Sequence, residues 1–383
     1  MSLGVATHEN FLAFKQTCSD KNLAGEWAQI EELYNKKLWH QLTIKLRTFV
    51  KHPSLQQGDE LLQLYQNFIE QFETKINPLA LVEIIAFILP KFADQKDAIK
   101  FLEKTEVKVK ESNCAVALCK VLEGQILLDK LKDLDGTKRI IEEVEKIIDG
   151  EDGVTPVHGR HYFLASQYYR QLGKHADYYK TALRYLGCID LSELAIGEQA
   201  QHAFFLGIAA LLGEGVYNLG ELLAHPILDS LKNTPNEWLV SLLLAFNSGN
   251  IAQFEKMRPQ WETIPDLKAH NLKLKQKIYL LCLMEMTFKR QANDRLLTFA
   301  EISNETGLPL DEVELLVMKA LAQGLVKGSI DQVASNVHMN WVQPRVLDKK
   351  QIASMVQRLT MWCKEVKSME ALLEERSQEF LLV

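Results

Sequence analysis

The side chains that could support metal or redox chemistry are few and scattered. His158 and His161 are spaced to share one face of a helix, and Cys114 and Cys119 lie in one apolar helical stretch. A zinc site needs several Cys, His or carboxylate ligands at short spacing, and neither pair has such neighbours. We therefore predict surface or capping histidines and buried structural thiols, with no metal ion and no cofactor.

Glycines cluster around Glu214 in a way that superficially resembles a phosphate-binding loop. The cluster contains Gly207, Gly213, Gly215 and Gly220. It lacks the Lys-Ser/Thr pair of a P-loop, and it follows a helical run where a nucleotide-binding fold would place a strand. We predict a helix end and close helix packing here.

No motif in the chain combines a nucleophile, its base and an oxyanion donor. Carboxylates that stand close together, such as Glu142, Glu143 and Glu145, are typical of a solvated helix face. We therefore predict that the chain is not an enzyme.

Length and composition indicate a folded protein with more than one packing unit. The chain has 383 residues, of which 47% are hydrophobic and 25% are charged, whereas one domain typically has about 100 to 150 residues. The six cysteines form no CxxC pair, and the start of the chain has no signal-peptide pattern. No apolar run is long enough to span a bilayer. We expect a soluble protein of the cytoplasm and nucleus, without a membrane partner.

Residues 26–290 read as one helical pattern after another, separated by Pro, Gly and Asn. In the clearest case Asn77 is expected to cap a helix whose first residue is Pro78. Such short helices bury their apolar faces by stacking in antiparallel pairs, so we predict a mainly α fold, a degenerate solenoid similar to tetratricopeptide repeats. The faces that carry this prediction are Trp27, Ile30, Leu33, Tyr34, Leu38 and Trp39, and Tyr178, Tyr179, Ala182, Leu183 and Leu186.

After Asn293 the sequence pattern changes to one that predicts a winged helix. Residues 298–301 form a capping box, Gly307 ends the first helix, and Pro309 is predicted to open the second. The second helix should end at Gly324 and bury Val313, Leu316, Val317, Ala320 and Leu321. Two strand-like runs follow, at residues 325–330 and 337–342, and the polar residues 331–336 between them predict a hairpin. Residues 296–299 are predicted to form a third strand.

The charge of this winged helix argues against DNA as its ligand. Residues 296–347 carry three basic and six acidic side chains, a net charge of -3. The helix that would enter the major groove begins with Asp311, Glu312 and Glu314. Neutralising phosphates dominates affinity for DNA, so we predict that the module binds protein.

A final helix is predicted from about Asp348 to Glu375. Its apolar residues step alternately by three and four, which is the pattern of a helix that needs partner helices. We call these residues the seam: Ile352, Met355, Leu359, Trp362, Val366, Met369 and Leu373. The apolar end at residues 380–383 has no evident place within the chain.

Helical repeats, a winged helix and a heptad-bearing tail, in this order, resemble the PCI-domain proteins. These are scaffolds of the proteasome lid, the COP9 signalosome and the translation initiation factor that binds the small ribosomal subunit. The closest resemblance is to PCI subunits of the proteasome regulatory-particle lid, and it extends from about Ile30 to the C-terminal helix. It is carried by residues 32–42, 178–188, 211–223, 312–321, 325–331 and 338–347.

The resemblance implies a non-catalytic scaffold that supports lid assembly and ATP-dependent degradation of ubiquitinated proteins. In that family winged helices associate side by side and C-terminal helices gather into one bundle. Expected partners are neighbouring PCI subunits, the C-terminal helices of lid subunits including the MPN-domain pair, and, as a further candidate, a ubiquitin-receptor subunit. Besides the seam, the expected contact residues are Leu325, Val326, Ile330, Val337, Met339 and Trp341 of the wing.

The implied organisation has four parts. They are a leader (1–25), N-terminal helical repeats (26–170), a PCI domain (171–347) whose winged helix is 296–347, and a C-terminal helix (348–383).

The sequence leaves three alternatives open. One is a PCI subunit of a related assembly, the signalosome or the initiation factor. Another is a nucleic-acid-binding PCI module of an mRNA-export complex, which would bind in a steeply salt-dependent way. A third is an enzyme with a hidden site. Lid complexes do contain a zinc deubiquitinase, but its HxHx motif has no counterpart among the histidines of this chain.

Overall fold

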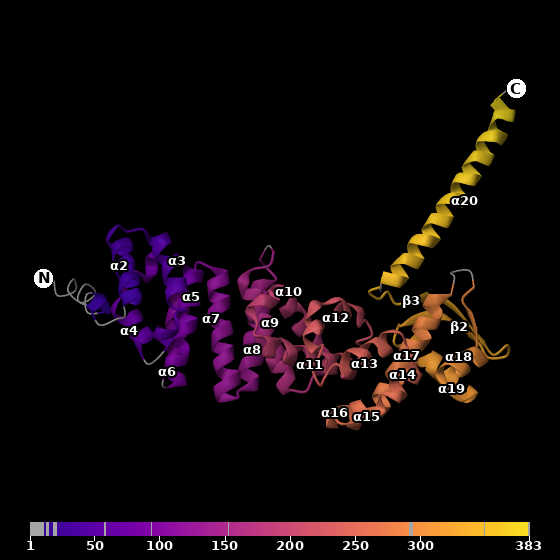
Figure 1. Cartoon of the computed structure of the whole chain (residues 1–383), viewed down its shortest axis with the longest axis horizontal. Coiled ribbons are helices and arrows are strands. Elements are labelled where there is room, and N and C mark those ends of the chain that lie inside the picture. The colour runs from indigo at the N-terminus through magenta and orange to yellow at the C-terminus, as the bar shows by residue number, and fades with distance from the viewer. Residues whose placement is uncertain are drawn as a thin grey trace. The chain divides into compact units, whose positions relative to one another are not determined.

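The computed structural model describes residues 11–12, 15–17, 21–56, 59–92, 94–151, 153–290, 294–347 and 349–381. The chain divides into two compact units, Met1–Asp190 and Leu191–Val383, whose elements are labelled in Figure 1. Most of the expected leader, Cys18 and the last two residues of the apolar C-terminal end lie outside the described residues.

The described part of the first unit is helical. Its α-helices are α2 (Lys21–Asn35), α3 (Trp39–Phe49), α4 (Glu60–Asn67), α5 (Pro78–Ile88), α6 (Gln95–Lys108), α7 (Asn113–Ile126), α8 (Leu134–Ile148), α9 (Pro156–Gln171) and α10 (His175–Cys188). Short 3-10 turns η1 (Pro53–Gln56), η2 (Ile69–Gln71), η3 (Glu73–Lys75) and η4 (Leu89–Lys91) join some of them, and a π-helical turn, η5 (Leu127–Leu131), follows α7.

Local sequence signals set several of these helix boundaries. The Asn77 side chain accepts a hydrogen bond from the Leu79 N–H at 2.9 Å, and Pro78 opens α5 as predicted. Asp94, Ser112 and Asp133 cap α6, α7 and α8 in the same way. Each cap satisfies one of the N–H groups that have no partner inside the helix.

Packing of consecutive helices confirms the helical-repeat prediction for this unit. Contacts join α2 to α3, α7 to α8 and α9 to α10, and Figure 1 shows the last four side by side. Trp27 and Phe49 are almost completely buried and meet edge to face at 4.8 Å between ring centroids. Leu38 departs from the prediction and is exposed, because it is the N-cap of α3 and lies outside the helical face.

The two histidines of α9 are buried, so their predicted surface position is wrong. The predicted capping role is confirmed for His158, whose Nδ1 accepts a hydrogen bond from the Thr155 N–H at 3.0 Å in a capping box. His161 is 3% exposed, and its Nδ1 has no hydrogen-bond partner among the residues that the structure describes. Burial, together with nearby His158, lowers the pKa of His161 to about 4.

His161 is therefore expected to make the first unit acid-sensitive. Between pH 6.5 and 4 the unfolded chain binds a proton that the folded chain excludes, so stability falls as the pH drops through this window. The loss should reach about 3 kcal/mol below pH 4. His161→Phe should flatten the pH dependence of urea unfolding followed by circular dichroism, and His40→Phe, at an exposed position, is the control for replacing a histidine by phenylalanine. An unaltered profile in His161→Phe would contradict this assignment.

The second unit begins with helices. They are the 3-10 turn η6 (Leu191–Glu193), α11 (Ile196–Leu212), α12 (Gly220–Ala224), the 3-10 helix η7 (Pro226–Leu231), α13 (Trp238–Asn247), α14 (Ile251–Lys256), α15 (Arg258–Trp261), α16 (Pro265–Ala269) and α17 (Asn271–Lys289). The boundary between the compact units lies after Asp190, because α9 and α10 pack against each other within the first unit. The division into four parts stays a prediction.

A small α/β module follows and has the predicted winged-helix order. It consists of β1 (Leu296–Thr298), α18 (Phe299–Thr306), α19 (Leu310–Ala322), β2 (Val326–Asp331) and β3 (Asn336–Val342), with an antiparallel sheet in the order β1-β3-β2. The chain then forms α20 (Lys349–Leu381), drawn in yellow in Figure 1.

Capping residues place the two helices of this module. Thr298 and Glu301 form the predicted capping box, and Gly307 ends α18 with a φ of 69° that suits glycine. Pro309 is the N-cap of α19 and not its first residue, because its backbone is extended, with ψ at 149°. The predicted inner face of α19 is buried except for half-buried Leu321.

Candidate protein interface

The wing residues predicted to contact a neighbour divide into two groups. Leu325, Val326, Val337 and Met339 are at most 2% exposed. Their side chains belong to the core of the module, where β2 packs on α19 and β3 on α17. Val337 and Met339 are two apart on β3 and therefore point to the same, inner face of the sheet. All four side chains are too deeply buried to contact a neighbour in this conformation.

The other two predicted wing residues remain accessible. Trp341 is exposed and lies opposite Lys327 in the β2–β3 register, with the Lys327 ammonium 5.0 Å from its ring centroid. Ile330 is half-buried. Strand β2 lies at one edge of the described sheet, and the exposed Lys327 on this strand is the kind of residue that limits uncontrolled edge pairing.

The outer face of α19 carries apolar residues that were not predicted from the sequence. Leu310, Leu315 and Met318 are each more than half exposed, and they lie beside the acidic residues Asp311 and Glu314. We call these three residues the α19 ridge. One feature of the sequence could have predicted this outer face. Leu315 and Met318 are three residues apart, which places them next to each other on a helix, and neither belongs to the set of apolar residues predicted to be buried.

The predicted seam lies along α20 and is exposed over its whole length. Its seven residues are between 42% and 64% exposed. The helix continues beyond the predicted end at Glu375 to Leu381. Isolated helices gain little stability from propensity alone, so a helix with a repeating apolar face of this length is suited to packing against other helices.

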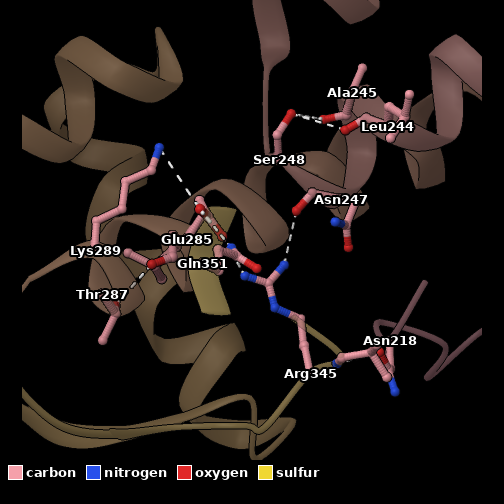
Figure 2. A network of polar contacts seen from close by, with 12 residues as sticks. Asn218, Leu244, Ala245, Asn247, Ser248, Glu285, Thr287, Lys289, Arg345 and Gln351 are labelled. Atoms are coloured by element: carbon pink, nitrogen blue, oxygen red, sulfur yellow. Dashed lines mark hydrogen bonds and ion pairs between the residues drawn. The ribbon is translucent and has the colours of Figure 1, made fainter. Parts of the chain in front are cut away.

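The segment that leads into α20 is held by a buried ion pair (Figure 2). Arg345 donates to a Glu285 carboxylate oxygen of α17 at 2.6 Å and to the Asn247 carbonyl at the end of α13 at 3.1 Å. Both side chains of the ion pair are less than 10% exposed. Gln351, in the first turn of α20, reaches the second Glu285 oxygen at 3.5 Å.

A second attachment holds the same segment from the other side. The Val346 N–H donates to the Asn218 side-chain oxygen at 3.2 Å. A Cβ on Gly220 would lie 2.7 Å from the Val346 carbonyl oxygen, so only glycine allows the segment to come this close. Together the two attachments fix where α20 begins relative to α12, α13 and α17.

The glycine cluster marks a helix end and close packing, as predicted. A Cβ on Gly207 would lie 2.7 Å from a methyl group of Leu239, which brings α11 close to α13. The buried ammonium of Lys277 closes the C-terminus of α11, donating to the carbonyls of Ala210, Leu211 and Gly213 at 2.7 to 3.1 Å. Burial lowers the pKa of Lys277 to about 7, and its carbonyl partners give it a structural role.

Among the cysteines that the structure describes, all but Cys363 fit structural roles. Burial raises the pKa of Cys119 to about 12 and that of Cys282 to about 11, which suppresses thiolate chemistry. Cys119 is buried as predicted, whereas Cys114, also predicted to be buried, is half-buried. Cys188 is half-buried as well, and Cys363 on α20 is exposed.

The described residues contain neither a metal-binding cluster nor a helix that could span a membrane. No group of three or more His, Cys, Asp or Glu side chains there is arranged to hold a metal ion. No helix within the described ranges combines the length and apolar character that crossing a membrane requires.

Two family profiles match successive stretches of the chain. The profile described as PSD13 N-terminal repeats matches residues 26–243, and the PCI domain profile matches residues 253–341. The latter covers α17 and nearly the whole winged-helix module.

Full-length relatives give the same result. The chain is 38% identical to the 26S proteasome non-ATPase regulatory subunit 13 homolog B of Arabidopsis thaliana, over 89% of this chain and 91% of the relative. It is 37% identical to the 26S proteasome non-ATPase regulatory subunit 13 of Dictyostelium discoideum, over 92% and 94%. It is 35% identical to the 26S proteasome regulatory subunit RPN9 of Saccharomyces cerevisiae, over 94% and 95%.

These similarities extend from the helical repeats through the winged helix, which agrees with the order of elements in the structure. The chain belongs to the 26S proteasome non-ATPase regulatory subunit 13 family.

Proposed function

We propose that this chain is a non-catalytic structural subunit of the proteasome regulatory-particle lid, present in cytoplasm and nucleus, where it supports ATP-dependent degradation of ubiquitinated proteins. The observation that carries the proposal is the exposed seam of α20 in a chain of this family. A seven-residue apolar stripe is costly to leave in water and is stabilised by burial against other helices.

The seam suits a helical bundle with more than one neighbour. Next to it, exposed Val356 and Cys363 widen the apolar stripe on one side, and exposed Leu372 widens it on the other. A stripe limited to the seam is typical of a two-stranded coiled coil, whereas a wider one packs against several helices. The proposed neighbours are the C-terminal helices of other lid subunits, including the MPN-domain pair.

The α19 ridge is the proposed contact of the winged-helix module with a neighbouring PCI subunit. Its apolar side chains lie exposed at the position that DNA-binding winged helices use for bases, and the acidic side chains around them disfavour phosphates. Trp341 offers a second accessible anchor of a type enriched at protein interfaces.

The double substitution Leu315→Asp and Met318→Asp should weaken this contact without unfolding the module, because both side chains are mostly exposed. We expect at least a tenfold loss of neighbouring subunits in affinity purification, with unchanged circular dichroism, since anchor residues at interfaces contribute about 2 kcal/mol or more each. Val333→Asp, at the fully exposed tip of the wing, is the matched control and should purify like the wild type. Equal recovery of neighbours by the double variant and the control would exclude the ridge.

Affinity purification of the tagged chain followed by mass spectrometry tests the function itself. We expect the other subunits of the regulatory particle to be recovered in stoichiometric amounts. Recovery of a signalosome, an initiation factor or an mRNA-export complex in their place would overturn the proposal. A gel-shift assay at low salt should show no binding of DNA or RNA.

A further inference from the structure

Charge is unevenly distributed along α20. Residues 349–368 contain five basic residues and one acidic residue, whereas residues 369–381 contain four acidic residues and one basic residue. One half of the helix is therefore positive and the other half is negative. Because charges beside an apolar seam decide which way a partner helix runs, this polarity carries information about orientation.

The residues that flank the seam can be placed by heptad position, with Ile352 at position a. The e positions are then Lys349, Val356, Cys363 and Glu370, and the g positions are Gln351, Arg358, Glu365 and Leu372. Of these eight residues all but Gln351 are exposed.

When a second copy of α20 packs antiparallel to the first, oppositely charged residues face each other. In an antiparallel pair, e positions face e positions and g positions face g positions. When Leu359 of one copy packs against Trp362 of the other, Arg358 faces Glu365 and Lys349 faces Glu370. Each of these two contacts occurs twice, because the pair has twofold symmetry.

The same alignment also joins the apolar side chains. Ile352 packs against Met369, and Met355 packs against Val366, so six of the seven seam residues have an apolar partner in each copy. Val356 faces Cys363 on the flank, which extends the apolar contact.

A parallel pair of the same helices would be less favourable. There a g position faces the e position five residues later on the other copy, which sets Glu365 against Glu370 twice. Arg358 would face Cys363 and have no acidic partner. A parallel pair would also place the rest of both chains at the same end of the helix pair. An antiparallel pair places them at opposite ends, separated by a helix about 50 Å long.

We propose that, outside the larger assembly, the seam of α20 is covered by a second copy of this chain in an antiparallel helix pair. The homodimer goes beyond the proposed lid function, because it concerns the free subunit. The seam cannot serve both contacts at once, so incorporation into a helical bundle must displace the second copy.

Sedimentation velocity of the purified full chain over a hundredfold concentration range tests the proposal. We expect a dimer that dissociates on dilution. Arg358→Glu should raise the dissociation constant about tenfold or more, because it replaces two attractive contacts by two repulsive ones. Adding Glu365→Arg to the same chain should restore the dimer, since the swapped charges again face each other.

Lys364→Glu is the control, because it makes the same change of charge on the exposed side of α20 opposite the seam. It should leave the dissociation constant unchanged. A chain that is monomeric at every concentration would overturn the proposal. The proposal would also be overturned by a dimer whose dissociation constant is unchanged by Arg358→Glu and lowered by Glu365→Arg alone. This is the result expected for a parallel pair. Neither outcome bears on whether the chain enters the proteasome.

Discussion

The triple substitution Leu359→Asp, Trp362→Asp and Val366→Asp is expected to abolish incorporation of the chain into the regulatory particle while leaving the isolated chain folded. The three side chains lie in the middle of the seam and are 48% to 60% exposed. Removing them costs the free chain little, but three carboxylates placed in a helical bundle would each be buried without a partner. An unpaired buried charge costs several kcal/mol, so three of them exceed what a helix contact of this size can supply.

The matched control places three Asp residues on the other faces of the same helix. Gln357, Thr360 and Ser368 are neutral and exposed, so their substitution by Asp adds the same charge and a similar loss of helix propensity. Incorporation is measured by native gel electrophoresis of assembled particles, and folding by thermal circular dichroism. The bundle proposal fails if the seam variant assembles as well as the control.

The substitution Arg345→Met is expected to cause the largest loss of stability in the second unit. The Glu285 carboxylate is 8% exposed in the intact protein. Without Arg345 its remaining partners would be Gln351 at 3.5 Å and the exposed Lys289 at 3.9 Å. Removing one partner of a buried ion pair typically costs about 3 to 5 kcal/mol. The Asn247 carbonyl at the end of α13 would also lose its donor.

Hydrogen exchange of the peptides that cover α17 and residues 343–347 measures this loss locally, which avoids assuming that the whole chain unfolds in one step. Adding Glu285→Leu should recover most of the protection, because the double variant buries no unpaired charge. Arg258→Met, which removes an exposed ion pair with Glu262 in the same unit, should change exchange little. If Arg345→Met exchanges like the wild type, the ion pair does not hold the start of α20.

Much of the fold could be predicted from the sequence because its signals are local. Asn77 with Pro78, the capping box of Thr298 and Glu301, and Gly307 each act within one helical turn, and each lies where it was predicted. Pro309 was placed one residue off, since a proline is compatible with both the cap and the first helical residue, and only the backbone conformation separates them.

The candidate interface was predictable in part. The seam of α20 follows from spacing alone, because a helix with period 3.6 brings residues three and four apart onto one face. Four of the six wing residues, in contrast, are core residues of the module. Alternation along a strand shows that Val326 and Val337 belong to an apolar face, but it does not show whether this chain or a partner covers that face.

The sequence by itself therefore determined the helical repeats, the winged helix, the seam and the acidic start of α19, because each rests on residues close together in the chain. The tertiary structure decided which apolar residues remain exposed, and it revealed the α19 ridge, the buried His161 and the contact of Arg345 with Glu285 across 60 residues. The physical reason is that burial and ion pairing depend on which distant segments meet, and no local pattern encodes such a meeting.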